Sequence, residues 1–297
     1  MKAIRQFEFG GPEVLRWADV PDPVAGDGQV VIDVEAAGVH LVDATIRRGE
    51  PFGPMGVATL PMTPGREVAG RVDGRPVVAH LGFANGGYAE RAVAPVASLH
   101  ELPEGIDPAE AVAMIGTGRT AVLLLDQAAL RADDVVLVPA AAGGLGALFL
   151  QAARNAGALA YGLASPAKLG VVAELGGVPV DYTQPAWPEA IAHRPTVLLD
   201  GVGGAAGRAA AELLGPGGRA VVFGWSAGEP TSYDGLDVAV TRMERPADLR
   251  PLEVRALAAL AGGSLRPLVT RFALADAAAA HAALEGRATT GKVVLVP

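Results

Sequence analysis

The chain has 297 residues, 51% of them hydrophobic, enough to bury the cores of one large domain or two ordinary ones, and we expect two. Its formal net charge of -8 and its pI of about 5.2 argue against a nucleic-acid partner, because binding to phosphate backbones needs clustered Lys and Arg. It contains no cysteine, which excludes disulfides, thiol nucleophiles and thiolate metal sites.

The N-terminal segment Met1–Phe7 lacks the apolar core of a signal peptide. No later stretch has about 18 uninterrupted apolar residues, the length that a membrane-spanning helix needs. We therefore expect a soluble, cytoplasmic protein without membrane contact.

Residues 1 to about 101 are rich in short strand patterns such as Val30–Val34 and Ala89–Val93, separated by Pro and Gly. From Asp107 the pattern changes, and Ala-rich helical segments alternate with apolar strands. The expected strands are Val135–Val138, Leu159–Leu163, Val178–Val180, Thr196–Leu199 and Arg219–Phe223. This alternation predicts a parallel sheet with helices on both faces, so the fold class is α/β with a β-rich first part.

A strand, a glycine turn and a helix follow one another in Val135–Gln151. Gly143 and Gly146 allow the backbone to approach a pyrophosphate and the helix to pack on the strand. The first helical N–H groups and the helix dipole favour an anion there. We interpret the turn as a dinucleotide site, with an ordinary strand-to-helix turn as the alternative.

Several motifs, spread from end to end, resemble one family. They are Met1–Ile4, Phe9–Leu15, Ala36–Asp43, Pro64–Glu67, Gly86–Glu90, the glycine turn and Thr289–Leu295. Together they are similar to the zinc-free quinone oxidoreductase branch, the zeta-crystallin-like branch, of the medium-chain dehydrogenase/reductase superfamily.

The resemblance implies a GroES-like β-rich catalytic domain interrupted by a Rossmann domain with a doubly wound parallel sheet. We expect the first at residues 1–116 and 266–297 and the second at 117–265. Spacing alone does not say which domain the last strand, Lys292–Val296, joins, and the resemblance places it in the first. The resemblance also implies a nicotinamide in the cleft between the domains, and a homodimer.

The segment after the second strand of this domain indicates which dinucleotide binds. An NAD site usually has an acid about 20 residues beyond the glycines, but Gly162–Lys168 contains none and the next is Glu174. Ser165 can donate to a 2′-phosphate and Lys168 supplies positive charge, so we predict NADP(H). The resemblance places Lys168, Tyr182 and Arg287 around that phosphate. The alternative is that Lys168 is an ordinary solvated lysine in the first turn of a helix and does not contact the cofactor.

The remaining predicted cofactor contacts lie at strand ends or helix starts. They are Ala142, Gly143, Gly144, Leu145 and Gly146 in the glycine turn, Thr120 near the nicotinamide phosphate by resemblance, and Val202, Phe223 and Gly224 after later strands. For Gly203 and Gly204, an ordinary turn is as good an interpretation as a cofactor contact.

Metal-assisted chemistry is disfavoured by the residues present. The zinc-binding relatives hold their metal partly through cysteine, and Arg66 stands before Glu67 where they have a ligand His. An arginine cannot bind a cation, so we predict no metal site. The chemistry that remains is hydride transfer from NADPH to an electrophilic acceptor, a quinone or an α,β-unsaturated carbonyl compound.

His40 is the most informative departure from the family pattern Gly-Val-Asn-Pro-Val-Asp, since it replaces the Asn while Asp43 is kept. It can serve as a proton donor or oxyanion partner, with Asp43 orienting it, and we predict both as catalytic. The alternative is a structural histidine at a strand-to-helix junction. Many relatives have a Tyr shortly after the position of Gly49, but this chain reads Glu50-Pro51-Phe52, which argues against a tyrosine donor.

Two other functions compete. Gly224–Gly228 spells Gly-x-Ser-x-Gly around Ser226, and Asp276 and His281 follow in the order of a hydrolase triad, but the residues after it form turns rather than the required helix. A noncatalytic NADPH-binding protein, a sensor or structural protein, is the second alternative. It is left open by the short segment Val68–Val78 and the short stretch after Trp225, which also leave the oligomeric state open.

Overall fold

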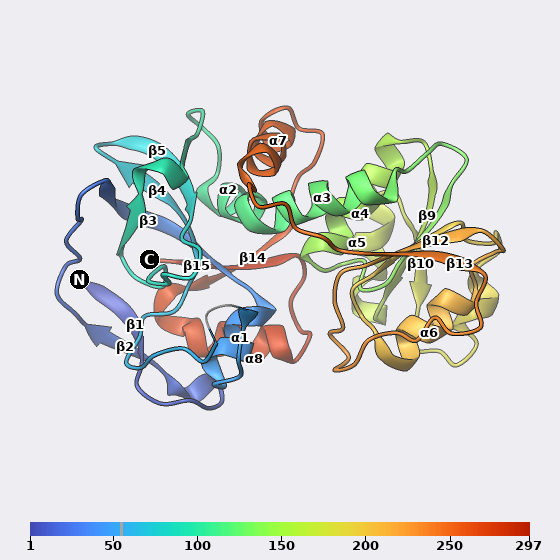
Figure 1. Ribbon diagram of the computed structural model, residues 1–297, viewed down its shortest axis with the longest axis horizontal. Helices are drawn as coiled ribbons and strands as arrows, with labels where there is room; N and C mark the ends of the chain where they lie inside the picture. Colours follow the sequence, from blue (N-terminus) through green and yellow to red (C-terminus); the bar gives the residue numbers. More distant parts are fainter. Residues whose placement is uncertain (54–55) are drawn as a thin grey trace. The chain divides into compact units, whose positions relative to one another are not determined.

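The computed structural model describes residues 1–53 and 56–297 (Figure 1). The chain forms two compact units. Unit 1 comprises Met1–Thr117 and Pro267–Pro297, and unit 2 comprises Gly118–Arg266. The first unit is thus built from both ends of the chain.

Unit 1 is a mostly antiparallel β structure with three α-helices among its described residues. Its strands are β1 (Lys2–Gln6), β2 (Leu15–Asp19), β3 (Gln29–Val39), β4 (Glu67–Val72), β5 (Arg75–His80), β6 (Arg91–Pro95), β7 (Leu99–Glu101), β14 (Val269–Ala273) and β15 (Lys292–Val296). Its helices are α1 (Leu41–Arg47), α2 (Pro108–Ala113) and α8 (Ala277–Glu285). The main sheet has the order β14-β15-β3-β4-β5-β7, with β6 also paired to β3, while β1 and β2 form a separate pair.

The long strand β3 organises unit 1. It pairs antiparallel with β4, β6 and β15, and its side chains Ile32, Val34 and Val39 lie in the buried core. The predicted strand at Ala89–Val93 is shifted in the structure to Arg91–Pro95, because pairing with β3 begins only where Arg91 faces Asp33. β15 lies between β14 and β3, so the last strand belongs to unit 1.

Unit 2 is a parallel sheet covered by helices. Its strands are β8 (Val135–Val138), β9 (Leu159–Ala164), β10 (Val178–Asp181), β11 (Val197–Asp200), β12 (Gly218–Val222) and β13 (Val238–Arg242). Its helices are α3 (Arg119–Ala128), α4 (Gly144–Asn155), α5 (Leu169–Glu174), α6 (Gly204–Glu212) and α7 (Arg250–Ala261). Five of these strands match the predicted ones to within a residue.

The strands of unit 2 follow the order β10-β9-β8-β11-β12-β13, and every neighbouring pair is parallel. Counted along the chain this is the order 3-2-1-4-5-6 of a Rossmann fold, which confirms the predicted fold class. The order reverses between β8 and β11, the place where such sheets bind ligands.

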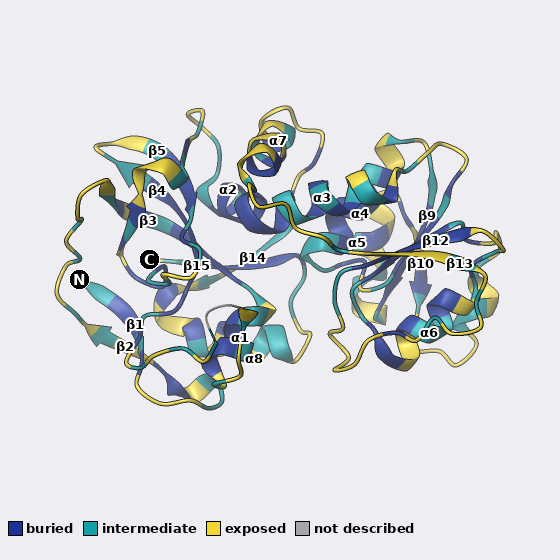
Figure 2. Ribbon diagram, in the orientation of Figure 1, coloured by how far each residue is buried: buried dark blue, intermediate teal, exposed yellow. Residues whose placement is uncertain are grey.

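The sheet of unit 2 is buried because its central strands are apolar on both faces. Val136, Leu137 and Val138 of β8 are all fully buried. Figure 1 shows α4 and α5 on one side of the sheet and α6 on the other, and Figure 2 shows the central strands in the colour of buried residues, while the edge strand β13 is mostly exposed.

One helical stretch is long and apolar enough to cross a membrane by length and composition. It runs from Pro108 to Ala128 through α2, the π-helical turn η4 (Met114–Gly118) and α3. Of its most apolar window, 67% is buried inside the protein, and a core helix of a soluble protein meets the same criteria. The expectation that no segment contacts a membrane stays a prediction.

Candidate functional site

The predicted cofactor residues of unit 2 gather at the carboxyl edge of its sheet. The glycine turn follows β8, Ser165 follows β9 and Tyr182 follows β10. These strand ends are neighbours, since Val138 faces Gly162 and Asp181 faces Ala164. Val202 follows β11, and Phe223 and Gly224 follow β12, on the other side of the switch point. Parallel register therefore brings separate stretches of sequence to one edge.

The glycine turn is built for close approach. A Cβ on Gly146 would lie 2.5 Å from the backbone oxygen of Ala140 and 2.7 Å from the Cα of Ala141, so no side chain fits there. Gly143 is the N-cap of α4, and Gly144, Leu145 and Gly146 form its first turn. The N–H groups of the first helical turn have no carbonyl partner within the helix, so they can donate to an anion. Ala142, also predicted, is buried just before them.

The four predicted phosphate ligands do not all lie in one unit. Ser165 and Lys168 lie at the ends of the 3-10 turn η5 (Pro166–Lys168), and burial lowers the pKa of the Lys168 ammonium. Tyr182 is 42% exposed, and its backbone N–H donates to the Ala164 carbonyl. Arg287 belongs to unit 1, where it follows α8 with a positive φ of 56°. Ser165, Lys168 and Tyr182 thus share an edge of unit 2.

The carboxylate that ends β10 is engaged by its own hydrogen bonds. Asp181 accepts from the Thr183 N–H at 2.9 Å and from the Gln184 side chain at 2.9 Å. The Thr183 hydroxyl also donates to Asp181, at 2.6 Å, and this bond, followed by the other two, lowers the pKa of Asp181. The Asp181 carboxylate is thereby held by hydrogen bonds within a local turn.

The loop after β11 is fixed by a buried carboxylate whose role the sequence did not indicate. Asp200 is fully buried, and its Oδ1 accepts from the backbone N–H groups of Val202 and Gly203, each at 3.0 Å. Its Oδ2 accepts from the hydroxyls of Thr231, at 2.5 Å, and Tyr233, at 2.9 Å. Burial and the charge of Asp200 raise the pKa of Tyr233, which keeps that hydroxyl a donor. Asp200 therefore holds the predicted contact Val202 in place.

The last predicted contacts in unit 2 are partly exposed. Phe223 stacks edge-on against Phe149, with ring centroids 5.6 Å apart, and covers Gly201, where a Cβ would lie 2.2 Å from its ring. Gly224 follows it. Thr120 is the second residue of α3 and is half-buried.

In unit 1, the imidazole of His40 meets two buried charges. His40 is the N-cap of α1, and its Nε2 lies 2.6 Å from Glu67 Oε1 and 2.7 Å from Lys292 Nζ. The Glu67 side chain is fully buried, that of Lys292 is 4% exposed, and that of His40 is 21% exposed. Among the three, His40 is the most exposed to solvent.

Burial opposes ionisation of Glu67, but the neighbouring charges of His40 and Lys292 outweigh it and hold the pKa of Glu67 well below its usual range. Lys292 Nζ lies 3.0 Å from Glu67 Oε2. Burial lowers the pKa of Lys292, and Glu67 counters that effect. Glu67 is thus an anion held between two basic side chains.

Asp43 does not orient the imidazole as predicted, because its contacts are elsewhere. Its Oδ2 accepts from the backbone N–H of His40 at 2.8 Å and from the Tyr88 hydroxyl at 3.2 Å. Its Oδ1 lies 3.6 Å from Arg66 Nε. Asp43 is buried, so it fixes the start of α1 rather than the ring.

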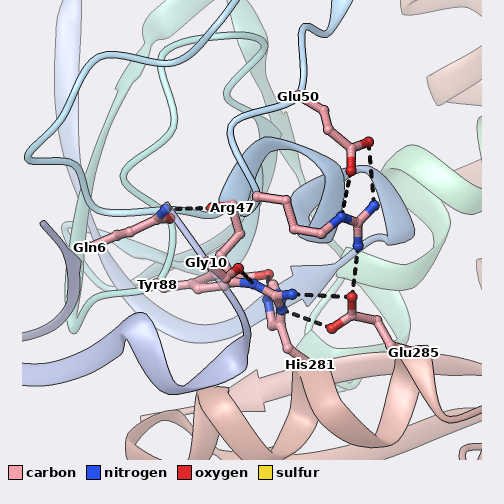
Figure 3. Close-up of polar contacts among 8 residues, drawn as sticks. Gln6, Gly10, Arg47, Glu50, Tyr88, His281 and Glu285 are labelled. Atoms are coloured by element: carbon pink, nitrogen blue, oxygen red, sulfur yellow. Dashed lines mark hydrogen bonds and ion pairs between the residues drawn. The ribbon is translucent and has the colours of Figure 1, made fainter. Parts of the chain in front are cut away.

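A buried polar network continues from Tyr88 to the surface (Figure 3). The Tyr88 hydroxyl lies 3.1 Å from His281 Nε2, and Arg47 Nη1 lies 3.1 Å from His281 Nδ1. Arg47 also makes two hydrogen bonds to the Glu285 carboxylate, at 2.9 and 3.1 Å. These contacts tie α1 to α8. Burial lowers the pKa of His281 to about 4, so this histidine is neutral at pH 7.

Sequence reasoning missed the roles of Glu67 and Lys292 as partners of the His40 ring. Both lie in motifs that carried the resemblance, Pro64–Glu67 and Thr289–Leu295. A basic residue that opens an otherwise apolar buried strand was the available signal for Lys292, since an unpaired buried ammonium is strongly disfavoured.

The donor set around His40 does not fit a zinc ion. Among residues 1–53 and 56–297, no three His, Cys, Asp or Glu side chains are grouped to hold a metal. The position between His40 Nε2 and the Glu67 carboxylate is taken by the Lys292 ammonium, and the Arg66 guanidinium lies beside Asp43. Two fixed cations would repel a third.

The hydrolase alternative lacks its elbow. Residues 223–237, all of them described, contain no helix after Ser226, whereas a nucleophile elbow opens directly into one. His281 is fully buried in the network of Tyr88 and Arg47, and Asp276 is the N-cap of α8. The tertiary structure gives Ser226 no triad.

Comparison with known proteins identifies the architecture. Residues 26–104 match the family model of the alcohol dehydrogenase GroES-like domain, and residues 176–295 match the model described as zinc-binding dehydrogenase. The chain is 32% identical over 338 residues to a quinone oxidoreductase from Sus scrofa, covering 100% of this chain and 98% of the relative.

Solved structures agree over the full length. The quinone oxidoreductase of Thermus thermophilus, solved alone and with NADPH, has 35% identity and a TM-score of 0.84, and 100% of both chains is covered. The Escherichia coli quinone oxidoreductase complexed with NADPH has 27% identity and a TM-score of 0.85, again with 100% of both chains covered. Because both domain types, the full length and the Rossmann strand order agree, this chain belongs to the quinone oxidoreductase branch of the medium-chain dehydrogenase/reductase superfamily.

Proposed function

We propose that this protein is an NADPH-dependent, zinc-independent oxidoreductase that reduces a quinone, or an alkene conjugated to a carbonyl group. The observation that carries the proposal is the carboxyl edge of unit 2, where the glycine turn, Ser165, Lys168 and Tyr182 follow adjacent parallel strands. The noncatalytic alternative is not favoured by the relatives, which are named as quinone oxidoreductases.

The residues of this edge fit a dinucleotide phosphate. The first turn of α4 offers three N–H donors to a pyrophosphate, and Gly146 leaves the space that a close backbone approach needs. Ser165 and Lys168 offer a hydroxyl donor and a cation to a 2′-phosphate. We propose that Val202, Phe223, Gly224, Thr120 and Arg287 contribute the remaining cofactor contacts. When bound, NADPH supplies a hydride, and the proton must come from the chain's own side chains.

Reduction of the acceptor by a hydride leaves a negative charge on its oxygen, which needs a proton. His40 is the exposed member of its cluster and can donate that proton. Asp43 acts as a positioning residue, because its carboxylate holds the backbone N–H of His40 at the start of α1. No metal enters this scheme, since the residues around His40 already carry the positive charge.

The cofactor assignment is tested by calorimetry with NADPH and NADH. Lys168→Ala removes a charge-assisted contact to the 2′-phosphate, so the Kd for NADPH should rise about 10- to 100-fold while that for NADH stays unchanged. Lys2→Ala is the matched control, because Lys2 is paired with Asp19 in unit 1 and should leave both constants unchanged. Equal wild-type affinities for NADPH and NADH would refute the assignment.

The reaction is tested by NADPH consumption with simple quinones and enones. We expect His40→Asn to retain much of the activity and His40→Ala to lose more, because the amide keeps a hydrogen-bond donor at that position. Full activity in both variants would exclude a role for His40. Wild-type protein that binds NADPH but oxidises it with none of these acceptors would favour the noncatalytic alternative.

We propose a homodimer on the strength of the resemblance. Light scattering after size-exclusion chromatography tests the dimer. A monomer at micromolar concentration would contradict it.

A further inference from the structure

The His40 ring has one nitrogen placed between an anion and a cation. Nε2 lies 2.6 Å from Glu67 Oε1 and 2.7 Å from Lys292 Nζ. An imidazole nitrogen either carries a hydrogen and donates, or lacks one and accepts. It therefore faces Glu67 as the cation of an ion pair in one protonation state and accepts a hydrogen bond from Lys292 in the other.

This arrangement removes the usual cost of changing the charge of a buried group. With Nε2 protonated, the imidazolium forms an ion pair with Glu67 Oε1, and Lys292 keeps its own contact with Glu67 Oε2 at 3.0 Å. With Nε2 unprotonated, the Lys292 ammonium supplies the donor. Neither state leaves this nitrogen unpaired, and an unpaired buried polar group would be destabilising.

The fold builds the cluster from three strands. β15 runs antiparallel to β3 with Val293 opposite Val39, so Lys292 comes next to His40. β4 pairs with β3 with Val68 opposite Ala37, so Glu67 lies beside Gly38. These registers are fixed by the buried core of unit 1.

Two glycines make room for the carboxylate. A Cβ on Gly38 would lie 2.4 Å from Glu67 Oε2, and a Cβ on Gly116 would lie 1.4 Å from Glu67 Oε1. Gly116 sits in the π-helical turn η4, a local departure from α-helical geometry that is frequent at functional sites. The position of Glu67 is thus specified from two sides.

We propose that Glu67 and Lys292 are positioning residues for proton delivery: Glu67 holds the His40 imidazole while it carries the proton, and Lys292 stabilises the same nitrogen after the proton has left. The proposal rests on the proposed function. The acceptor gains a hydride, which is one proton with two electrons. Its oxygen then carries a negative charge. The His40 imidazolium gives its Nε2 proton to that oxygen and keeps the hydrogen on Nδ1. The Nε2 of the neutral ring then accepts from Lys292 until a proton from water restores the imidazolium.

Other charges face the cluster from the surrounding elements and must stay constant in a test. Asp43 lies on α1, Arg66 precedes β4, and His80 ends β5 close enough to act on Glu67. None of these is changed in the variants below. Because Glu67 and Lys292 carry opposite charges, removing one or the other should shift the titration midpoint of His40 in opposite directions.

The experiment is a pH titration of histidine side chains by NMR in protein labelled at its 5 histidines, with His40 assigned through His40→Asn. Lys292→Met removes the competing cation and should raise the titration midpoint of His40 by about one pH unit or more. Glu67→Gln removes the anion and should lower it by a similar amount. A double variant of both changes should return it close to the wild-type value, since the two charges cancel.

The same variants are then assayed for quinone reduction across pH. The limb of the kcat profile that follows His40 should move in the same directions as the NMR midpoint. Lys292→Arg keeps the charge, serves where Lys292→Met does not fold, and should leave the midpoint near that of the wild type. A purely structural role would lower activity in both single variants without opposite shifts.

Shifts of the same sign, or no shifts, in the two single variants would overturn the proposal. NMR midpoints that move oppositely while the kcat profile stays fixed would also overturn it, because His40 would then not deliver the proton. Failure of the proposed function has a different signature: the wild type would reduce no quinone or enone at any pH, while the substrate-free NMR titration would still be measurable.

Discussion

His281 makes the stability of unit 1 sensitive to acid. Arg47 has only donors, so Nδ1 of His281 must accept from it and Nε2 carries the hydrogen, which faces the Tyr88 hydroxyl. A second proton would occupy Nδ1 and face the Arg47 guanidinium. Burial first, and then the charge of Arg47, lower the pKa of His281 from 6.5 to about 4, in spite of Asp43 and Glu285.

The sign of the pH effect follows from proton binding. Between pH 6.5 and about 4 the unfolded chain binds a proton at this histidine and the folded chain does not. The contribution is therefore complete above pH 6.5 and is lost as the pH falls toward 4. At about 1.4 kcal/mol per pKa unit the full loss is about 3 kcal/mol, of which about 2 kcal/mol is lost between pH 7 and pH 5.

The assay is urea unfolding at pH 7 and pH 5, followed by pulsed hydrogen exchange with mass spectrometry. Peptides from α1 and α8 report unit 1, and peptides from α6 report unit 2 as an internal control. His281→Gln cannot take up a proton in this range, so the wild type should lose about 2 kcal/mol more than the variant between the two pH values. Equal losses in both proteins would refute the reasoning, even if the variant is less stable at pH 7.

Three further predictions concern cofactor binding and packing. Gly146→Ala places a methyl group 2.5 Å from the Ala140 oxygen and should raise the Kd for NADPH at least tenfold by calorimetry; Gly170→Ala, at a helical glycine with nothing within 4 Å, should leave it unchanged. The methyl group of Gly116→Ala would collide with Glu67, so this change should destabilise unit 1 by about 1–3 kcal/mol and lower kcat. An activity and a urea midpoint equal to those of the wild type would contradict the packing argument. Asp200→Asn replaces an acceptor of four hydrogen bonds and should weaken NADPH binding about tenfold, while Asp234→Asn, an exposed change in the same segment, should not; equal affinities would show that the loop needs no such anchor.

The parallel sheet of unit 2 was predictable because its signals are local. Each strand is a short apolar run of the kind that is buried on both faces, and each is followed by a turn and a helical pattern. The glycine turn is equally local, since strand, turn and helix are adjacent in sequence. The carboxyl edge follows from parallel pairing, so Val202, Phe223 and Gly224 were expected there from the strand pattern, whereas Tyr182 was placed by the resemblance.

The sequence by itself therefore determined the fold class, the glycine turn and the absence of thiol chemistry, because these depend on residue type and short spacing. Only the tertiary structure decided the environment of His40. Its ring partner Lys292 is 252 residues away in the chain, and the two meet because β3 and β15 share a register that the buried core imposes. The contact of Asp43 with the His40 backbone is a local capping box at the start of α1, whereas the pairing of β4 with β3 placed Glu67, rather than Asp43, against the imidazole.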